Sequence, residues 1–311
     1  MQRKILVATC GLIQYWSADD TFRMIHEAGF DGVDWNIPIL SGWDREAIKR
    51  GTYAPGIFAE SVDEMLRFYR PQLDAAEKYG VEIRQVHAPF PCYVQDFPEF
   101  CDLYVEVAKK TIRFCEQVGA RNVVVHGASL ALTDGTQSPA SIAGINDHLY
   151  AALVPTLQKT HVTVCLENLF TEYQHHVVAG VCTDPEEADS CIDRYNEMAG
   201  RECFGLCFDT GHQNLIGGNQ RTYIQRVGKR LKALHIHDNN GDFDAHLMPY
   251  AGNIRWEQFL QGLKDVGYRG DLSFETVQQP DIRRGVQREV VPVLLKAIHD
   301  IGVVFAHALD G

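Results

Sequence analysis

Short apolar runs recur along the chain, and they alternate with longer amphipathic segments. The runs at 162–166, 204–208 and 231–234 are almost continuously hydrophobic, which is typical of parallel strands buried on both faces. The segment 97–118 instead places Val105, Ala108 and Ile112 on one helical stripe. The pattern therefore predicts strands that alternate with helices.

The alternation continues through the whole sequence, at a spacing of roughly thirty to forty residues per unit. We expect strands at 4–8, 33–35, 81–86, 122–125, 162–166, 204–208, 231–234 and 271–274. We expect helices at 18–28, 60–79, 97–118, 137–159, 185–198, 219–229, 255–266 and 284–301, and a long loop over the active face at 36–59. Eight such units favour a closed barrel over an open doubly wound sheet. The predicted fold class is α/β, with a single (β/α)8 TIM barrel as one domain over residues 1–311.

The composition limits which partners the protein is expected to bind and in which compartment it is expected to occur. The formal net charge of −12 and the pI of about 5.5 disfavour a nucleic-acid partner. Nine cysteines without a CxxC pair indicate free thiols in a reducing cytoplasm. Residues 1–8 are predicted to form the first strand, not a signal peptide, because the apolar part is short and acidic residues soon follow. No stretch is predicted to span a membrane. The sequence does not determine the oligomeric state, and a homo-oligomer is one of the states that it allows.

Each predicted strand from the third to the eighth is followed by an acidic or imidazole side chain. In chain order these are His87, His126, Glu167, Asp209, His235 and Glu275. A single Asp after a strand usually caps the next helix, so one such residue carries little information. The whole set is different, because the carboxyl ends of barrel strands meet on one face. Buried carboxylates at that face would repel one another unless a cation lay between them. The set therefore predicts a divalent metal site.

Several short motifs resemble the xylose isomerase-like TIM barrel superfamily, over essentially the whole chain. That superfamily contains sugar and sugar-phosphate isomerases and epimerases and the endonuclease IV group of DNA-repair enzymes. The motifs are His87-Ala88-Pro89, His126-Gly127, Leu166-Glu167-Asn168, Asp209-Thr210-Gly211-His212, His235-Ile236-His237-Asp238-Asn239, Asp244-Ala245-His246 and Glu275-Thr276. The resemblance implies one divalent ion (Mn, Zn, Mg or Co) held by Glu167, Asp209, His235 and Glu275. His235 is preferred over His237 because the family's ligand is typically followed three residues later by an acid, although both histidines share a strand face.

The resemblance implies a metal-dependent sugar or sugar-phosphate isomerase or epimerase acting on a small-molecule sugar. The ion would act as a Lewis acid, and a carboxylate would move a proton through a cis-enediolate. Glu167 and Glu275 are the candidate bases. His212 is expected to bond a substrate oxygen or to orient Asp209. The candidate substrate contacts are His87, His126, His237, Trp35 and Tyr250, the last of which replaces a glycine of the family's usual Pro-Gly-x-Gly turn.

Two other classes remain open. A metal-dependent lyase or dehydratase acting on a keto-sugar derivative would use the same proton abstraction. An endonuclease IV-like phosphodiesterase would hold up to three Zn, with His87, His126, His212, Asp244 and His246 as additional metal ligands. The acidic stretch 184–189 fits poorly with a DNA groove.

Overall fold

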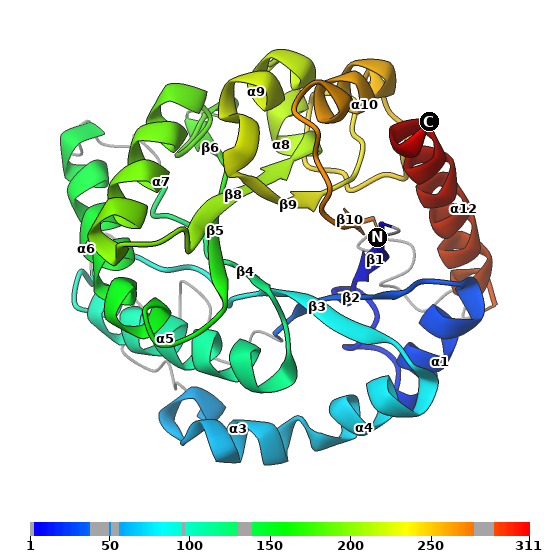
Figure 1. Ribbon diagram of the computed structural model, residues 1–311, viewed down its shortest axis with the longest axis horizontal. Helices are drawn as coiled ribbons and strands as arrows, with labels where there is room; N and C mark the ends of the chain where they lie inside the picture. The colour runs from blue at the N-terminus through cyan, green and yellow to red at the C-terminus, as the bar shows by residue number, and fades with distance from the viewer. Residues whose placement is uncertain are drawn as a thin grey trace.

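Eight parallel strands form a closed ring at the centre of the protein (Figure 1). The structure is a computed structural model that describes residues 3–37, 50, 56–94, 97–129, 139–173, 175–276 and 289–311. Its sheet order is β10-β1-β2-β3-β4-β5-β8-β9. The strands are β1 (Ile5–Ala8), β2 (Gly32–Asn36), β3 (Glu82–His87), β4 (Asn122–Val124), β5 (Thr163–Glu167), β8 (Phe204–Asp209), β9 (Leu231–His235) and β10 (Leu272–Phe274).

The ring closes between β9 and β10. The amide of Ile236 donates to the carbonyl of Ser273 at 2.8 Å, and the amide of Glu275 donates to the carbonyl of Ile236 at 3.0 Å. This closure confirms the predicted TIM barrel and brings every strand's carboxyl end to one face.

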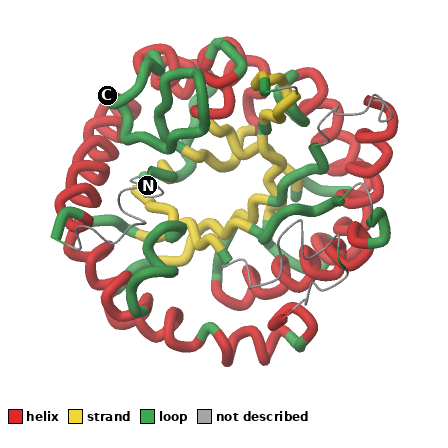
Figure 2. The backbone as a smooth tube through the Cα atoms, turned by 180° about the vertical axis from the view of Figure 1, so that it is seen from behind, coloured by secondary structure: helices red, strands yellow, loops and turns green. Residues whose placement is uncertain are grey.

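Helices surround the strands, as the view from behind also shows (Figure 2). They are α1 (Ala18–Ala28), α3 (Val62–Phe68), α4 (Arg70–Tyr79), α5 (Phe100–Val118), α6 (Pro139–Leu157), α7 (Pro185–Ala199), α8 (Thr210–Leu215), α9 (Gln220–Val227), α10 (Trp256–Asp265) and α12 (Val291–Asp310), with the 3₁₀ turns η1 (Gly56–Ala59) and η2 (Gly228–Arg230). Local sequence sets their ends: Ser17 caps α1 by accepting from the amide of Asp20, and Gly29 ends it with a φ of 102°. The main core lies between the strands and these helices.

Two predicted helices differ from the structure, and some observed elements were not predicted. The single helix expected at 60–79 is two helices, α3 and α4, because Pro71 has no amide hydrogen to continue the first helix into the second. The last helix was expected at 284–301, whereas α12 begins at Val291 and ends at Asp310. Its predicted start at 284–288 lies outside the described residues, as does most of the loop expected at 36–59. The hairpin of β6 (Phe170–Tyr173) and β7 (His176–Ala179), and the short α8, were not predicted.

One helix bears on the expectation that no stretch spans a membrane, although it is weak evidence against it. By length and composition alone, α12 is long and apolar enough to do so. Its apolar side packs against α1, β1 and β10, where Leu295, Ile298 and Phe305 are buried. Barrel packing buries this side of the helix, whereas Val293 and Val304 on α12 stay exposed. All nine cysteines are free, as predicted.

Candidate active site

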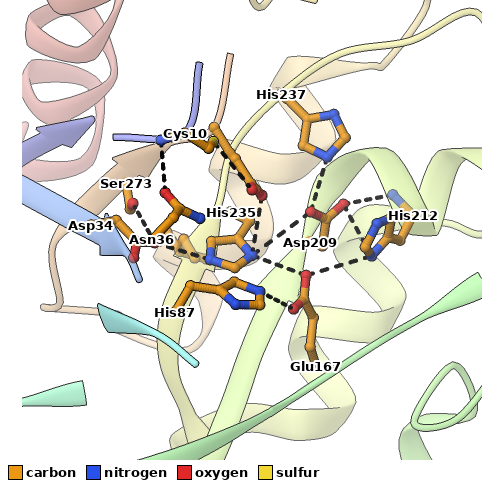
Figure 3. Close-up of polar contacts among 12 residues, drawn as sticks. Cys10, Asp34, Asn36, His87, Glu167, Asp209, His212, His235, His237 and Ser273 are labelled. Carbon is orange, nitrogen blue, oxygen red and sulfur yellow. Dashed lines mark hydrogen bonds and ion pairs between the residues drawn. The ribbon is translucent and has the colours of Figure 1, made fainter. Parts of the chain in front are cut away.

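The predicted metal ligands lie around one nitrogen of His235 (Figure 3). Its Nδ1 is 2.9 Å from Glu167 Oε1, 3.4 Å from Glu275 Oε2 and 4.0 Å from Asp209 Oδ2. His235 and Asp209 are fully buried, and the two glutamates are less than a tenth exposed. The strands β8 and β9 and the exit of β10 therefore bring ligand atoms of Asp209, His235 and Glu275 within 4.8 Å of one another, and Glu167 forms a second such group with His87 and His235.

Asp209 has a local role as well as its place in this group. It is the N-cap of α8, because its Oδ1 accepts from the amide of His212 at 2.6 Å. Its Oδ2 lies 2.9 Å from Nε2 of His237. A Cβ on Gly211 would lie 2.0 Å from His237 Cε1, so only glycine lets this ring approach the start of α8. The capping role and the ligand role expected for Asp209 are thus compatible.

Two further clusters adjoin the central group. Glu167 Oε2 lies 2.8 Å from His126 Nε2 and 3.7 Å from His87 Nε2. On the other side, Asp244 Oδ2 lies 2.9 Å from His246 Nε2 and 3.8 Å from His212 Nε2. All five residues proposed as additional ligands therefore border the central group.

The charges in these clusters depend strongly on one another. Burial opposes the ionisation of Glu167, yet His235 and His126 hold the pKa of its carboxyl well below its usual range. Burial also opposes the protonation of His212 and His246. Asp209 and Asp244 nevertheless raise the pKa of His212 to about 10, and Asp244 with Glu275 raises the pKa of His246 to about 9. The buried carboxylates of the site therefore stabilise positive charge on the neighbouring histidines.

These observations fit a divalent cation. The donors are carboxylate oxygens and imidazole nitrogens, which suit Mn, Zn, Co or Mg. Within the described residues, the buried Nδ1 of His237 and Oδ1 of Asp244 have no hydrogen-bond partner. Polar atoms are rarely left in that state, so the site is built to accept a further partner.

A cavity of about 360 Å³ opens over the clusters. Its lining includes the polar residues His87, His126, Glu167, His212, Asp244, His246 and Glu275. Phe90 stacks on His126 with ring centres 4.8 Å apart, and Phe170 meets His212 edge-on at 5.1 Å. Phe170 comes from the unpredicted β6–β7 hairpin, and no sequence signal pointed to it.

Two residues predicted to contact substrate lie elsewhere. Trp35 is fully buried between the barrel and the outer helices, where its ring packs against Tyr69 and Phe114. Tyr250 is 63% exposed and packs beside Trp256 and Phe305. Neither is among the described residues that line the cavity. His237, which was also predicted to contact substrate, is fully buried with its Nε2 2.9 Å from Asp209 Oδ2, and it too is not among the described residues that line the cavity.

Asp238, the acid that supported the preference for His235, holds the following loop in place. Its carboxylate accepts from the amides of Tyr250 and Ile254 and from the indole of Trp256, at 3.0 to 3.1 Å. The motif from His235 to Asn239 therefore positions both His235 and the loop that carries Asp244 and His246.

Residues 22–289 match the model of the family described as "Xylose isomerase-like TIM barrel". The chain belongs to this family, which confirms the resemblance seen in its motifs.

Curated proteins that are similar to this chain in sequence carry different names. "Uncharacterized protein y4fM" of Sinorhizobium fredii is 26% identical over 86% of both chains. "Probable endonuclease 4" of Staphylococcus carnosus is 26% identical over 56% of this chain and 57% of its own. "Inosose dehydratase" of Lacticaseibacillus casei is 29% identical over 35% of this chain and 40% of its own.

Solved structures share the fold at lower identity. A D-tagatose 3-epimerase-like protein has a TM-score of 0.67 at 22% identity, with 99% of this chain and 100% of that chain covered. The 3-keto-D-glucoside 4-epimerase YcjR from E. coli, in its apo form, has a TM-score of 0.67 at 16% identity, with 97% and 100% covered. The IOLI protein with a bound zinc atom has a TM-score of 0.67 at 14% identity, with 98% of each chain covered.

Proposed function

We propose that this protein is a divalent-metal-dependent isomerase or epimerase of a sugar or sugar derivative. The observation that carries the proposal is the convergence of Glu167, Glu275 and Asp209 on Nδ1 of His235. Epimerases among the solved structures of the same fold, and a relative named D-psicose 3-epimerase, support it.

The bound ion would supply Lewis-acid chemistry, which acidifies the carbon next to a carbonyl. Glu167 and Glu275 are the proposed bases. They approach His235 from strands that are not neighbours, β5 and β10, so they reach the cavity from different sides. One carboxylate can therefore take a proton from one face of a substrate carbon while the other returns it to the opposite face. Such a transfer converts one epimer into the other through a cis-enediolate.

His212 is proposed to bond a substrate oxygen beside the reacting carbon. Its Nδ1 faces the carbonyl of Asn168 at 3.0 Å, while its Nε2 points toward Asp244 at the cavity wall. An imidazolium at this position can donate to an oxygen that gains negative charge. Among the described residues lining the cavity there is no lysine or arginine, which favours a sugar without a phosphate group.

Specific observations also favour a second candidate. Further groups of side chains could each hold an ion, namely His87, Glu167 and His235, and His237, Asp244 and His246. A relative is named "Probable endonuclease 4". A zinc phosphodiesterase is therefore the second proposal. The net charge of −12 makes a DNA substrate less favourable than a sugar. A dehydratase using the same bases follows from the likeness to inosose dehydratase.

Metal content separates the two main proposals. We expect one divalent ion per chain, measured by plasma mass spectrometry on protein expressed without chelator and freed of loosely bound metal by gel filtration. Three zinc ions per chain, together with cleavage of an abasic duplex, would support the phosphodiesterase and contradict the isomerase.

Metal binding is also expected to release a proton. Cys207, Glu167 and Glu275 raise the pKa of His235 well above its ordinary value despite burial, so the metal-free protein keeps a proton on this imidazole at a pH where a free histidine has lost it. A ligand histidine must be neutral, so the ion displaces that proton, and affinity rises with pH until the imidazole deprotonates unaided. Titration calorimetry in buffers of different ionisation enthalpy measures the release. An affinity that is flat between about pH 6 and pH 8 would contradict the assignment of His235 as a ligand.

A further inference from the structure

A buried carboxylate lies beneath the site, inside the barrel. Asp34 on β2 is fully buried, and its Oδ2 lies 3.0 Å from Nε2 of His235 (Figure 3). The same oxygen accepts from Nε2 of Gln85 at 2.6 Å and from the hydroxyl of Ser273 at 3.3 Å. Side chains from β2, β3, β9 and β10 thus meet at one oxygen atom.

Barrel stability does not account for an acid at this position. The strands β4, β5, β8 and β9 contribute small apolar side chains to a buried cluster of Val124, Cys165, Cys207 and Ala233. Removing a carboxylate from water costs several kcal/mol, and an apolar side chain of similar volume often serves stability as well or better. Oδ1 of Asp34 also lacks a hydrogen-bond partner within the described ranges. A function that needs this negative charge is the simpler explanation.

The geometry points to Asp34 as the positioning residue that fixes His235 for metal binding. This inference rests on the proposed function, because it assumes an ion at the central group. The imidazole has one nitrogen toward Asp34 and the other toward Glu167, Asp209 and Glu275. With Asp34 accepting from Nε2–H, the lone pair of Nδ1 is left for the ion.

The alternative neutral tautomer of His235 would prevent the ion from binding. A proton on Nδ1 would be donated to Glu167 Oε1 at 2.9 Å and would occupy the atom that the ion needs. Asp34 stabilises the productive tautomer because a carboxylate is a stronger acceptor than a neutral group. Gln85 and Ser273 keep the carboxylate from rotating away, since both donate to the oxygen that faces His235.

The test is Asp34→Asn, which keeps the shape of the side chain and removes its charge. We expect affinity for Co²⁺, measured by competition with a chromophoric chelator, to fall by about 10- to 100-fold. The visible absorption of bound Co²⁺ should also change, because the donor strength of His235 changes. Thr111→Val is the matched control: Thr111 is fully buried and bonds the carbonyl of Val107 within α5. It should leave both the affinity and the spectrum unchanged even if the protein melts at a lower temperature.

The outcomes separate this inference from the proposed function. If the unaltered protein binds no divalent ion, both fail. If it binds Co²⁺ and Asp34→Asn binds it equally well with the same spectrum, only the role of Asp34 is wrong. Should Asp34→Asn not fold, long-range ¹H–¹⁵N spectra of the Zn-loaded unaltered protein decide, with His235 assigned from a His235→Gln variant. A proton on Nε2 and metal on Nδ1 supports the inference, and the reverse overturns it.

Discussion

Replacing Glu167 or Glu275 by glutamine is expected to abolish turnover while the barrel stays folded. An amide has nearly the same shape as the carboxylate but cannot take up a proton. General-base catalysis contributes about 10²- to 10⁴-fold, and loss of a charged ligand would add to that deficit. The readout is deuterium incorporation from D₂O into a panel of ketoses and keto-sugars, followed by mass spectrometry. This assay detects proton transfer even before the product is known.

Glu116→Gln serves as the matched control for both variants. Glu116 is near the end of α5 and pairs with His161 at the surface. Its variant therefore makes the same change from carboxylate to amide, but outside the site. Its variant should retain full activity. Circular dichroism should show the same helix and strand content in all three variants. Full activity of Glu167→Gln or of Glu275→Gln would show that the altered residue is not a base.

Asp209→Ala is expected to lower metal affinity by roughly 100-fold or more, since a direct ligand should matter at least as much as its supporting residues. The substitution also removes the N-cap of α8, so the free energy of unfolding should fall by about 0.5–2 kcal/mol. Metal content after dialysis against a weak chelator, measured by plasma mass spectrometry, checks the first effect. Thermal unfolding of the metal-free protein checks the second.

Asp184→Ala separates the two effects of that variant. Asp184 caps α7 in the same way, by accepting from the amide of Glu186, but it is not among the described residues that line the cavity. Its loss should lower stability by a similar amount and leave metal content unchanged. Asp209 would leave the set of proposed ligands if both variants kept the metal equally well.

Much of the site followed from the ends of the predicted strands. His87, Glu167, Asp209, His235 and Glu275 were each found by the same signal, an ionisable residue where an apolar run stops. The signal works because a barrel of parallel strands has all its carboxyl ends on one face, so separate positions in the chain must meet. The grouping of these residues could be predicted, but the contacts of each nitrogen and oxygen could not. Those depend on strand registers, such as the shift between Leu206 and Cys207, that no local pattern encodes.

The loops were less predictable than the strands. Tyr250 was expected at the substrate, yet it adopts a left-handed backbone with a φ of 73° at a turn held by Asp238 and faces solvent. Phe170 lines the cavity because a hairpin folds back over the barrel mouth. Loop positions depend on contacts with distant parts of the chain, so hydrophobic periodicity gives no guide to them.

Strand β2 shows which of its features the sequence determined and which the tertiary structure decided. The sequence by itself predicted a short strand at 33–35 of an α/β barrel, between the break at 29–32 and the Gly- and Pro-containing stretch 36–59. It did not determine which side chains of that strand face the barrel interior. Adjacent side chains point to opposite faces, and closure of the ring turned Trp35 outward to the helices and Asp34 inward to His235. Both faces of this strand are buried, so the sequence could not tell whether Asp34 or Trp35 faces the interior, and only the closed barrel distinguishes the two.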